Sequence, residues 1–174
     1  IDEDPQYAQL YSGLADTYAL LGDWQYAAMT AKEALPKAKA AAIKALELDS
    51  ALGEAHNSLA FCLDGFEWDF DSAGKEFRRA IELNPGYATA HEWYSMLLGN
   101  TGRLPEALAE VKLALETDPL SPSINTTFGL LLFEARRYED AIRQLRRTVE
   151  VFPDLARPQA LLGANLPPLM HGVI

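Results

Sequence analysis

The chain repeats itself every 34 or 35 residues, and this period limits its fold more than any other feature does. Helix-ending phrases such as "AIELNPGYA" and "ALETDPLSP" recur along the sequence. The residues that follow these helix ends lie 35, 34 and 34 positions apart: Ser50, Pro85, Pro119 and Pro153. A repeat of this length is typical of solenoids, in which units stack because no unit can bury its apolar face alone.

Apolar and small residues inside each unit predict a helix–turn–helix. Apolar side chains three or four positions apart share a helical face, and such pairs are Leu14/Tyr18, Leu59/Leu63 and Phe128/Leu132. Small residues, which let a second helix approach closely, recur in two slots: Ala15, Ala60, Ser95 and Gly129 in one, and Ala38, Ala73, Ala107 and Ala141 in the other. Proline cannot continue a helix, so it ends each of the later units.

The order of these residues resembles the tetratricopeptide repeat, whose pattern is W-x-x-L-G-x-x-Y, then A-x-x-x-F, then P. The second unit places seven residues in these slots: His56, Leu59, Ala60, Leu63, Ala73, Phe77 and Pro85. The resemblance implies an all-α, right-handed superhelical solenoid of stacked antiparallel helix pairs. The expected organisation within residues 1–153 is four units, at about 5–50 with an 11-residue insertion, 51–85, 86–119 and 120–153. A capping helix at 154–165 and a loose tail at 166–174 are expected to follow.

The inserted residues of the first unit lie between positions 22 and 38. Thr30 and Glu33 have the spacing of a capping box, which predicts that the long second helix starts near Ala31 and that Pro36 bends it early. A start at Pro36 itself is the alternative, since proline is favoured as a first helical residue.

Four aromatic residues lie in or near the turns of the first two units. Trp24 and Tyr26 belong to the inserted loop, where they either pack on the first helix pair or form an exposed contact patch. Trp68 and Phe70, in "FEWDFDSA", are expected to plug the tight turn between the helices of the second unit. An exposed aromatic hook is the alternative for this second pair.

Composition argues against several classes of partner. The net charge of −10 disfavours nucleic acid and anionic membrane surfaces, because like charges repel. No run of eighteen apolar residues is present, so no membrane span is expected. Arginine pairs on the second helices, Arg78-Arg79 among them, are expected to form a solvated, salt-bridged surface.

Residues that could carry out chemistry are scarce. Cys62, the only cysteine, lies in an apolar run and is expected to be a small buried hydrophobe. His56 and His91 occupy one slot of consecutive units, so a packing role is expected for both rather than metal binding. Phosphate-binding loops and hydrolase or metalloprotease motifs are missing from the sequence. We therefore expect no enzyme activity, no metal and no cofactor.

Two further expectations concern context. The stretches "PKAKAAAIKALELD" and "EFRRAIELNPGYATAHEWY" are similar to repeat regions of large bacterial multidomain regulators and kinases. The chain also opens "IDEDPQYA", without methionine or signal peptide, so a segment of a longer protein is expected. A cytoplasmic location is the corresponding expectation.

The resemblance implies that five positions of each first helix face a concave groove. Carried over through the alignment, they give these candidate binding residues: Asp16, Glu54, Asn57, Phe61, Asp64, Glu92, Met96, Asn100, Leu130, Phe133 and Glu134. The set holds five carboxylates and neither lysine nor arginine, and Phe61, Met96, Leu130 and Phe133 could form an apolar floor. The lysines with which some family members clamp a terminal carboxylate are missing from these slots.

The acidic and apolar groove predicts a binding scaffold for a peptide or protein segment that carries Lys or Arg and an apolar anchor. Asp16, Glu54, Asp64 and Glu92 would read the charge. The alternative for the acidity is that it only keeps an unoccupied face soluble. The alternatives for function are a self-association or structural module of a larger regulator and a small-molecule sensor.

Overall fold

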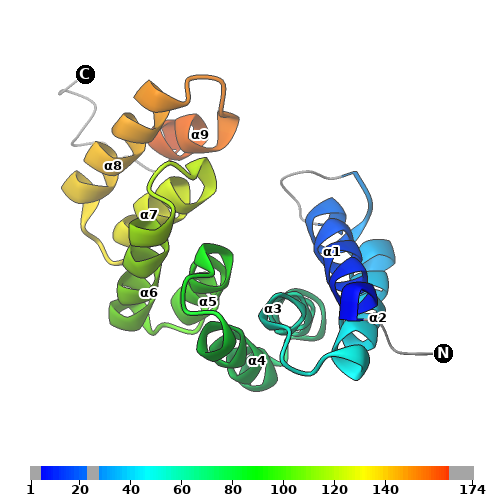
Figure 1. The fold of residues 1–174 in the computed structure, drawn as a ribbon. Helices are drawn as coiled ribbons and strands as arrows, with labels where there is room; N and C mark the ends of the chain where they lie inside the picture. Colours follow the sequence, from blue (N-terminus) through cyan, green and yellow to red (C-terminus); the bar gives the residue numbers. More distant parts are fainter. Residues whose placement is uncertain (1–4, 23–27, 165–174) are drawn as a thin grey trace.

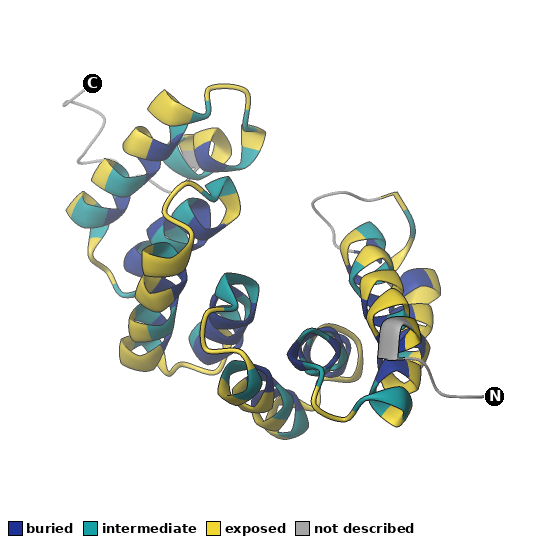
Figure 2. Ribbon diagram, in the orientation of Figure 1, coloured by how far each residue is buried: buried dark blue, intermediate teal, exposed yellow. Residues whose placement is uncertain are grey.

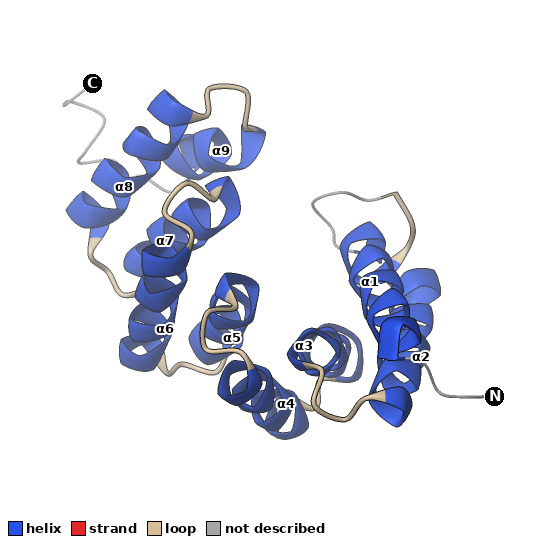
Figure 3. Ribbon diagram, viewed as in Figure 1, coloured by secondary structure: helices blue, strands red, loops and turns tan. Residues whose placement is uncertain are grey.

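The structure, a computed structural model, describes residues 5–22 and 28–164, and these residues form helices packed in antiparallel pairs (Figures 1 and 3). The elements in chain order are α1 (Pro5–Gly22), α2 (Ala31–Leu48), α3 (Gly53–Cys62), the π-helix η1 (Leu63–Glu67), α4 (Phe70–Leu83), α5 (Ala88–Asn100), α6 (Leu104–Thr117), α7 (Pro122–Glu134), α8 (Tyr138–Val151) and α9 (Ala156–Ala164). Each odd-numbered helix from α1 to α7 packs on the helix after it and on the next odd-numbered helix. The expected all-α solenoid is confirmed.

The helix pairs follow one another along an arch. In Figure 1, α1, α3, α5 and α7 line the inside of the arch, and α2, α4, α6 and α8 form its outer layer. We call the inner side the concave face and the other the outer face. The helix α9 packs on α8 and α7 at the C-terminal end. The tail at 166–174 lies outside the described residues.

Small residues between the helices of a pair allow the close approach that the sequence predicts. Ala60, Ala73 and Ala107 are fully buried. Figure 2 shows that the buried residues, in dark blue, lie where the helices face one another. At Gly129 of α7, a Cβ atom would lie 2.6 Å from Cδ2 of Leu145 on α8, closer than carbon atoms pack. Glycine is therefore the residue that fits between α7 and α8 at this point.

The long helix α2 begins at Ala31 with Thr30 as its N-cap, which confirms the predicted start, and it continues through Pro36. The Thr30 hydroxyl donates a hydrogen bond of 2.7 Å to the Glu33 carboxylate, so Thr30 and Glu33 do interact at this terminus. The insertion thus lengthens the first helix pair, in which α1 and α2 have 18 residues each.

A polar seam joins each unit to the one before it. Near the start of α3, α5, α7 and α9, a polar side chain hydrogen-bonds a backbone carbonyl six positions earlier: His56 to Ser50, His91 to Pro85, Asn125 to Pro119 and Gln159 to Pro153. The first three of these side chains also bond a residue of the second helix in their own unit: Glu76, Glu110 and Gln144. The histidines are therefore structural, as expected, and they act through hydrogen bonds as well as packing.

The turn before α4 differs from the expected aromatic plug. Trp68 is 73% exposed and Phe70 is 37% exposed, so the expectation that they fill the turn is wrong and the exposed alternative holds. Trp68 has a φ of 58°, and Gly102 and Arg136, at intervals of 34 residues, have φ of 79° and 59°. The turn between paired helices therefore requires a left-handed residue in three units, and in the second unit this residue is a tryptophan. Trp24 and Tyr26 lie outside the described residues.

Candidate functional site

The N-terminal part of the concave face holds a cluster of carboxylates between α1 and α3. Asp16 of α1 accepts a hydrogen bond from the Ser58 hydroxyl of α3. Burial raises the pKa of Asp16, the Ser58 hydrogen bond opposes this rise, and the negative charge of Glu54 adds to it. Two carboxylates that repel each other and are half-buried favour a cation between or beside them.

Asn57 and Tyr87 extend this cluster toward α5. Asn57 is fully buried, and its amide lies against the Tyr87 phenol without forming a hydrogen bond of standard geometry within the described residues. Burial and the charges of Asp16 and Glu54 raise the pKa of Tyr87, so this phenol stays protonated. The cluster therefore combines carboxylate oxygens, which only accept hydrogen bonds, with an amide and a phenolic hydroxyl, which can also donate them.

An apolar element lies next to the carboxylates. The rings of Phe61 on α3 and Trp93 on α5 have their centroids 4.6 Å apart and are inclined by 41°. Both rings are half-buried. Asp64 follows Phe61 by almost one turn, and burial raises the pKa of its carboxyl to about 6. An aromatic pair and a partly desolvated carboxylate thus occur together where α3 and α5 meet.

Glu92 of α5 is almost fully enclosed. Its side chain is 5% exposed, and Oε1 accepts hydrogen bonds from Ser123 Oγ at 2.6 Å and Thr127 Oγ1 at 3.0 Å, both on α7. Burial raises the pKa of Glu92, while these hydrogen bonds and then the positive charge of Arg157 on α9 oppose the rise. Glu92 therefore ties α5 to α7 in this structure.

The remaining candidates lie toward the C-terminal end of the concave face. Met96, Leu130 and Phe133 are half-buried, and the ring of Phe133 packs 5.3 Å from that of Tyr138. Asn100 and Glu134 are exposed. The structure thus brings Asp16, Glu54 and Asn57 together in one cluster, and it places Glu92 in a separate cluster farther along.

Sequence reasoning missed the partners that set the properties of these carboxylates. Ser58 and Thr127 look like ordinary helix residues, and Tyr87 precedes α5 in a turn. Their contacts cross from one unit to the next, so a pattern within a single unit does not reveal them. The one available signal was that residues 58 and 127 immediately precede the aligned slots of the apolar stripe.

Other kinds of site find no support in the part of the chain that the structure describes. There, no three His, Cys, Asp or Glu side chains are grouped so that they could hold a metal ion. Cys62 is buried, and burial raises the pKa of its thiol to about 12, so the reactive thiolate is suppressed. Among the same residues, no helix combines the length and apolar character that crossing a bilayer would require.

A curved stack of helix pairs with side chains exposed along its inner face defines a helical repeat protein. The family model described as "Tetratricopeptide repeat" matches residues 69–122 and 126–164, so the chain belongs to the tetratricopeptide repeat (TPR) family. Repeats of this family generally mediate protein–protein interaction and are generally non-catalytic. This membership confirms the family that the sequence pattern resembles.

Known proteins with a similar sequence or fold agree with this assignment. A stretch of 85 residues, 49% of this chain, is 28% identical to small glutamine-rich tetratricopeptide repeat-containing protein 2 of Mycosarcoma maydis, of which it spans 24%. The fold is similar to that of a thermophilic TPR protein of Thermus thermophilus, with a TM-score of 0.74 and 18% identity over 94% of this chain and 83% of the other. It is also similar to Pseudomonas aeruginosa pilF, with a TM-score of 0.70 and 21% identity over 87% and 67% of the two chains.

Proposed function

We propose that this chain is a non-catalytic scaffold whose concave face binds a protein segment that carries basic residues and an apolar anchor. The observation that carries the proposal is the half-buried carboxylate pair of Asp16 and Glu54 between α1 and α3. Half-buried Asp64 lies almost one turn beyond Phe61, whose ring packs on that of Trp93. Partly desolvated carboxylates attract a cationic side chain more strongly than fully hydrated ones do. Aromatic rings beside them supply apolar contact area for the anchor.

The arrangement of charges favours Asp16, Glu54 and Asp64 as the residues that contact the ligand. Glu92 is enclosed by Ser123 and Thr127, so its carboxylate is engaged within the protein. Asn57 is fully buried, so a bound peptide does not reach its amide in this structure.

Peptide binding at two salt concentrations tests this function. Basic, acidic and neutral peptides of equal length, each with one aromatic residue, are titrated into the whole chain, and affinity is read from fluorescence anisotropy. The double variant Glu54→Gln and Asp64→Asn should weaken binding of the basic peptide by about five- to tenfold, which is the order expected for two exposed or half-buried charge pairs. High salt should weaken it as well.

A matched control separates local recognition from net charge. Glu116→Gln with Glu150→Gln removes the same charge from the outer helices α6 and α8, where both residues are exposed. This control should bind the basic peptide as the parent does. Equal losses in both double variants would mean that only the overall acidity attracts the peptide, and the concave site would be rejected.

A further inference from the structure

The second unit carries three exposed aromatic side chains at the junction of η1 and α4. Phe66, Trp68 and Phe70 are 38%, 73% and 37% exposed, and the Trp68 and Phe70 rings meet edge-to-face at 6.1 Å. Tryptophan is the residue most enriched where protein interfaces derive their energy, and exposed apolar clusters are typical of interaction sites. None of the three residues is among the candidates on the concave face, so the concave site does not account for their exposure.

The backbone that presents Trp68 is held in a conformation that suits tryptophan poorly. Its φ of 58° lies in the left-handed region, which a bulky residue adopts only with strain. Gly102 occupies the equivalent turn of the next unit and meets the same requirement without a side chain to clash. The residue is preceded by the π-helix η1, a feature often found at functional sites. The fold thus requires the turn but does not require the tryptophan.

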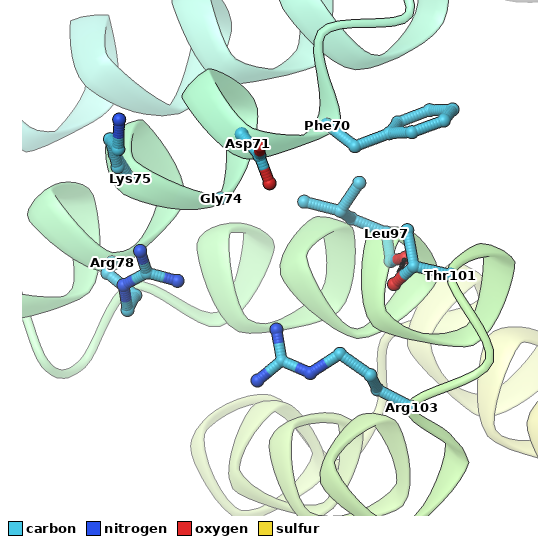
Figure 4. A pocket seen from close by; sticks show the side chains of 8 residues that line it. All are labelled: Phe70, Asp71, Gly74, Lys75, Arg78, Leu97, Thr101 and Arg103. Atoms are coloured by element: carbon cyan, nitrogen blue, oxygen red, sulfur yellow. Dashed lines mark hydrogen bonds between the residues drawn. The ribbon is translucent and has the colours of Figure 1, made fainter.

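A pocket of about 390 Å³ adjoins the aromatic cluster, within the size range of ligand sites. It lies between α4, the end of α5 and the start of α6 (Figure 4). Phe70 lines it on the side of the aromatic cluster, and Leu97 forms an apolar wall. In Figure 4 the guanidinium groups of Arg78 and Arg103 extend toward each other across the opening. The pocket is therefore continuous with the aromatic cluster and cationic along one side.

The cations of the pocket outnumber its carboxylates. Lys75, Arg78 and Arg103 line it, against the single carboxylate of Asp71. Arg103 is paired with Glu106 at 2.5 Å, whereas Arg78 donates a hydrogen bond of 3.1 Å to the Tyr94 hydroxyl and forms no ion pair with a carboxylate among the described residues. An arginine held in place by a neutral partner keeps its charge available for an anion. The expected salt-bridged surface is therefore found at Arg79, which pairs with Glu82, but not at Arg78.

We propose that Trp68, Phe70, Lys75, Arg78 and Arg103 form a second docking surface, which binds an acidic segment of a partner protein. An apolar side chain of that segment packs on Trp68 and Phe70. A carboxylate a few residues farther along the segment pairs with Arg78 in the pocket, since Phe70 and Arg78 lie about two turns apart on α4. The aromatic cluster extends beyond what a small anion would contact, which favours a peptide as the occupant. The surface belongs to the outer helix α4 and has the opposite charge preference to the concave face, so this proposal does not rest on the proposed function.

Three labelled peptides of equal length test the second surface with the whole chain: an acidic peptide with one phenylalanine, the same peptide with serine in its place, and a basic peptide with phenylalanine. The acidic phenylalanine peptide should bind, and Arg78→Gln should weaken its binding by about tenfold, in the range of interface hot spots. Arg79→Gln is the matched control, because Arg79 is the next residue of α4 but pairs with Glu82. Binding of the basic peptide should be the same in both variants and in the parent.

Trp68→Gly supplies the second arm. It should weaken binding of the acidic peptide by about tenfold while the midpoint of thermal unfolding stays unchanged or rises, because glycine accepts the left-handed backbone. Equal effects of Arg78→Gln and Arg79→Gln, or equal binding of the serine and phenylalanine peptides, would overturn the proposal, the latter in favour of a simple anion site. A fall in the unfolding midpoint of Trp68→Gly would also overturn it, since Trp68 would then serve the fold.

Discussion

The hydrogen bonds of His91 require its ring to be charged, and this makes the stability of the third unit depend on pH. Nδ1 lies 2.7 Å from Oε2 of Glu110, and Nε2 lies 3.1 Å from the carbonyl oxygen of Pro85. A carboxylate and a carbonyl oxygen only accept hydrogen bonds, whereas a neutral imidazole has one donor. Both bonds are made only by the imidazolium, so the Glu110 hydrogen bond raises the pKa of His91, with help from Pro85 and against the effect of burial.

The direction of the pH effect follows from this shift. The pKa of His91 is raised in the folded state above its ordinary value of 6.5, so folding is favoured by protonation. The stabilisation is fully present below about pH 6.5 and is lost as pH rises through the higher pKa of the folded protein. His91 and Glu110 side chains are 6% and 23% exposed, so solvent screens their pair only in part. Loss of the charged hydrogen bond should cost roughly 1.5 kcal/mol.

The fourth unit supplies a replacement that does not titrate. There, Asn125 bonds the Pro119 carbonyl, and Gln144 donates to Asn125 Oδ1 at 2.8 Å. The double variant His91→Asn with Glu110→Gln copies this arrangement into the third unit. Urea unfolding of parent and variant is followed by circular dichroism from about pH 5.5 to pH 9, with equal denaturant slopes as the condition for comparing midpoints.

The difference between the two proteins isolates the pair, because all other titrating groups are common to both. The parent should lose about 1.5 kcal/mol relative to the double variant over this range, which corresponds to a shift of about 0.5–1.5 M in the urea midpoint. His91→Ala, which leaves the Glu110 carboxylate and the carbonyl without a donor, should be less stable than both at low pH. If the difference in unfolding free energy between parent and double variant stays constant across the pH range, the inference that the His91 ring is charged in the folded protein is refuted.

Three further predictions concern two glycines and the concave face. Gly129→Ala should destabilise the protein by about 1 kcal/mol, because the clash with Leu145 outweighs the gain in helix propensity. Gly74→Ala should stabilise the protein by about 0.5–1 kcal/mol, because its Cβ would meet its neighbours at ordinary contact distances of 3.5 and 3.7 Å. Chemical denaturation measures the free energy of unfolding of both variants. A Gly129→Ala protein as stable as the parent would contradict the clash. Since the pKa of Asp64 is about 6, binding of a basic peptide should weaken as pH falls from about 7.5 to about 5, and in Asp64→Asn this pH dependence should be reduced.

The fold could be predicted from the sequence because equivalent positions of successive units carry residues of the same kind, so the same contact between helices is marked several times. The small residue at position 129 recurs in register with Ala60, and in the structure Leu145 packs directly against it. The start of α2 at Ala31 was readable because Thr30 and Glu33 are close together on the chain. Such signals are local or periodic, so one sequence suffices to read them.

The candidate site was less accessible, since its properties come from contacts between units. The enclosure of Glu92 depends on Ser123 and Thr127, which lie 31 and 35 residues away. The exposure of Trp68 depends on a left-handed turn for which the available signal was Gly102 in the same register of the next unit. The sequence pattern can therefore predict that a carboxylate lies on the concave face, but not whether it is exposed to solvent or enclosed by another helix.

The period also separates residues that the fold explains from residues that it does not. Units with one backbone impose one requirement at each equivalent position, so a residue that meets the requirement poorly is retained for another reason. His91 and Asn125 both bridge the seam, and the fold accounts for both. Trp68 occupies the position that Gly102 holds in the next unit, and its ring is exposed beside Phe70 instead of filling the turn. Arg136 adopts the same left-handed turn in the fourth unit, so the feature that distinguishes Trp68 is its exposed ring packed against Phe70. The stability of Trp68→Gly measures how much strain the second unit accepts to present that ring.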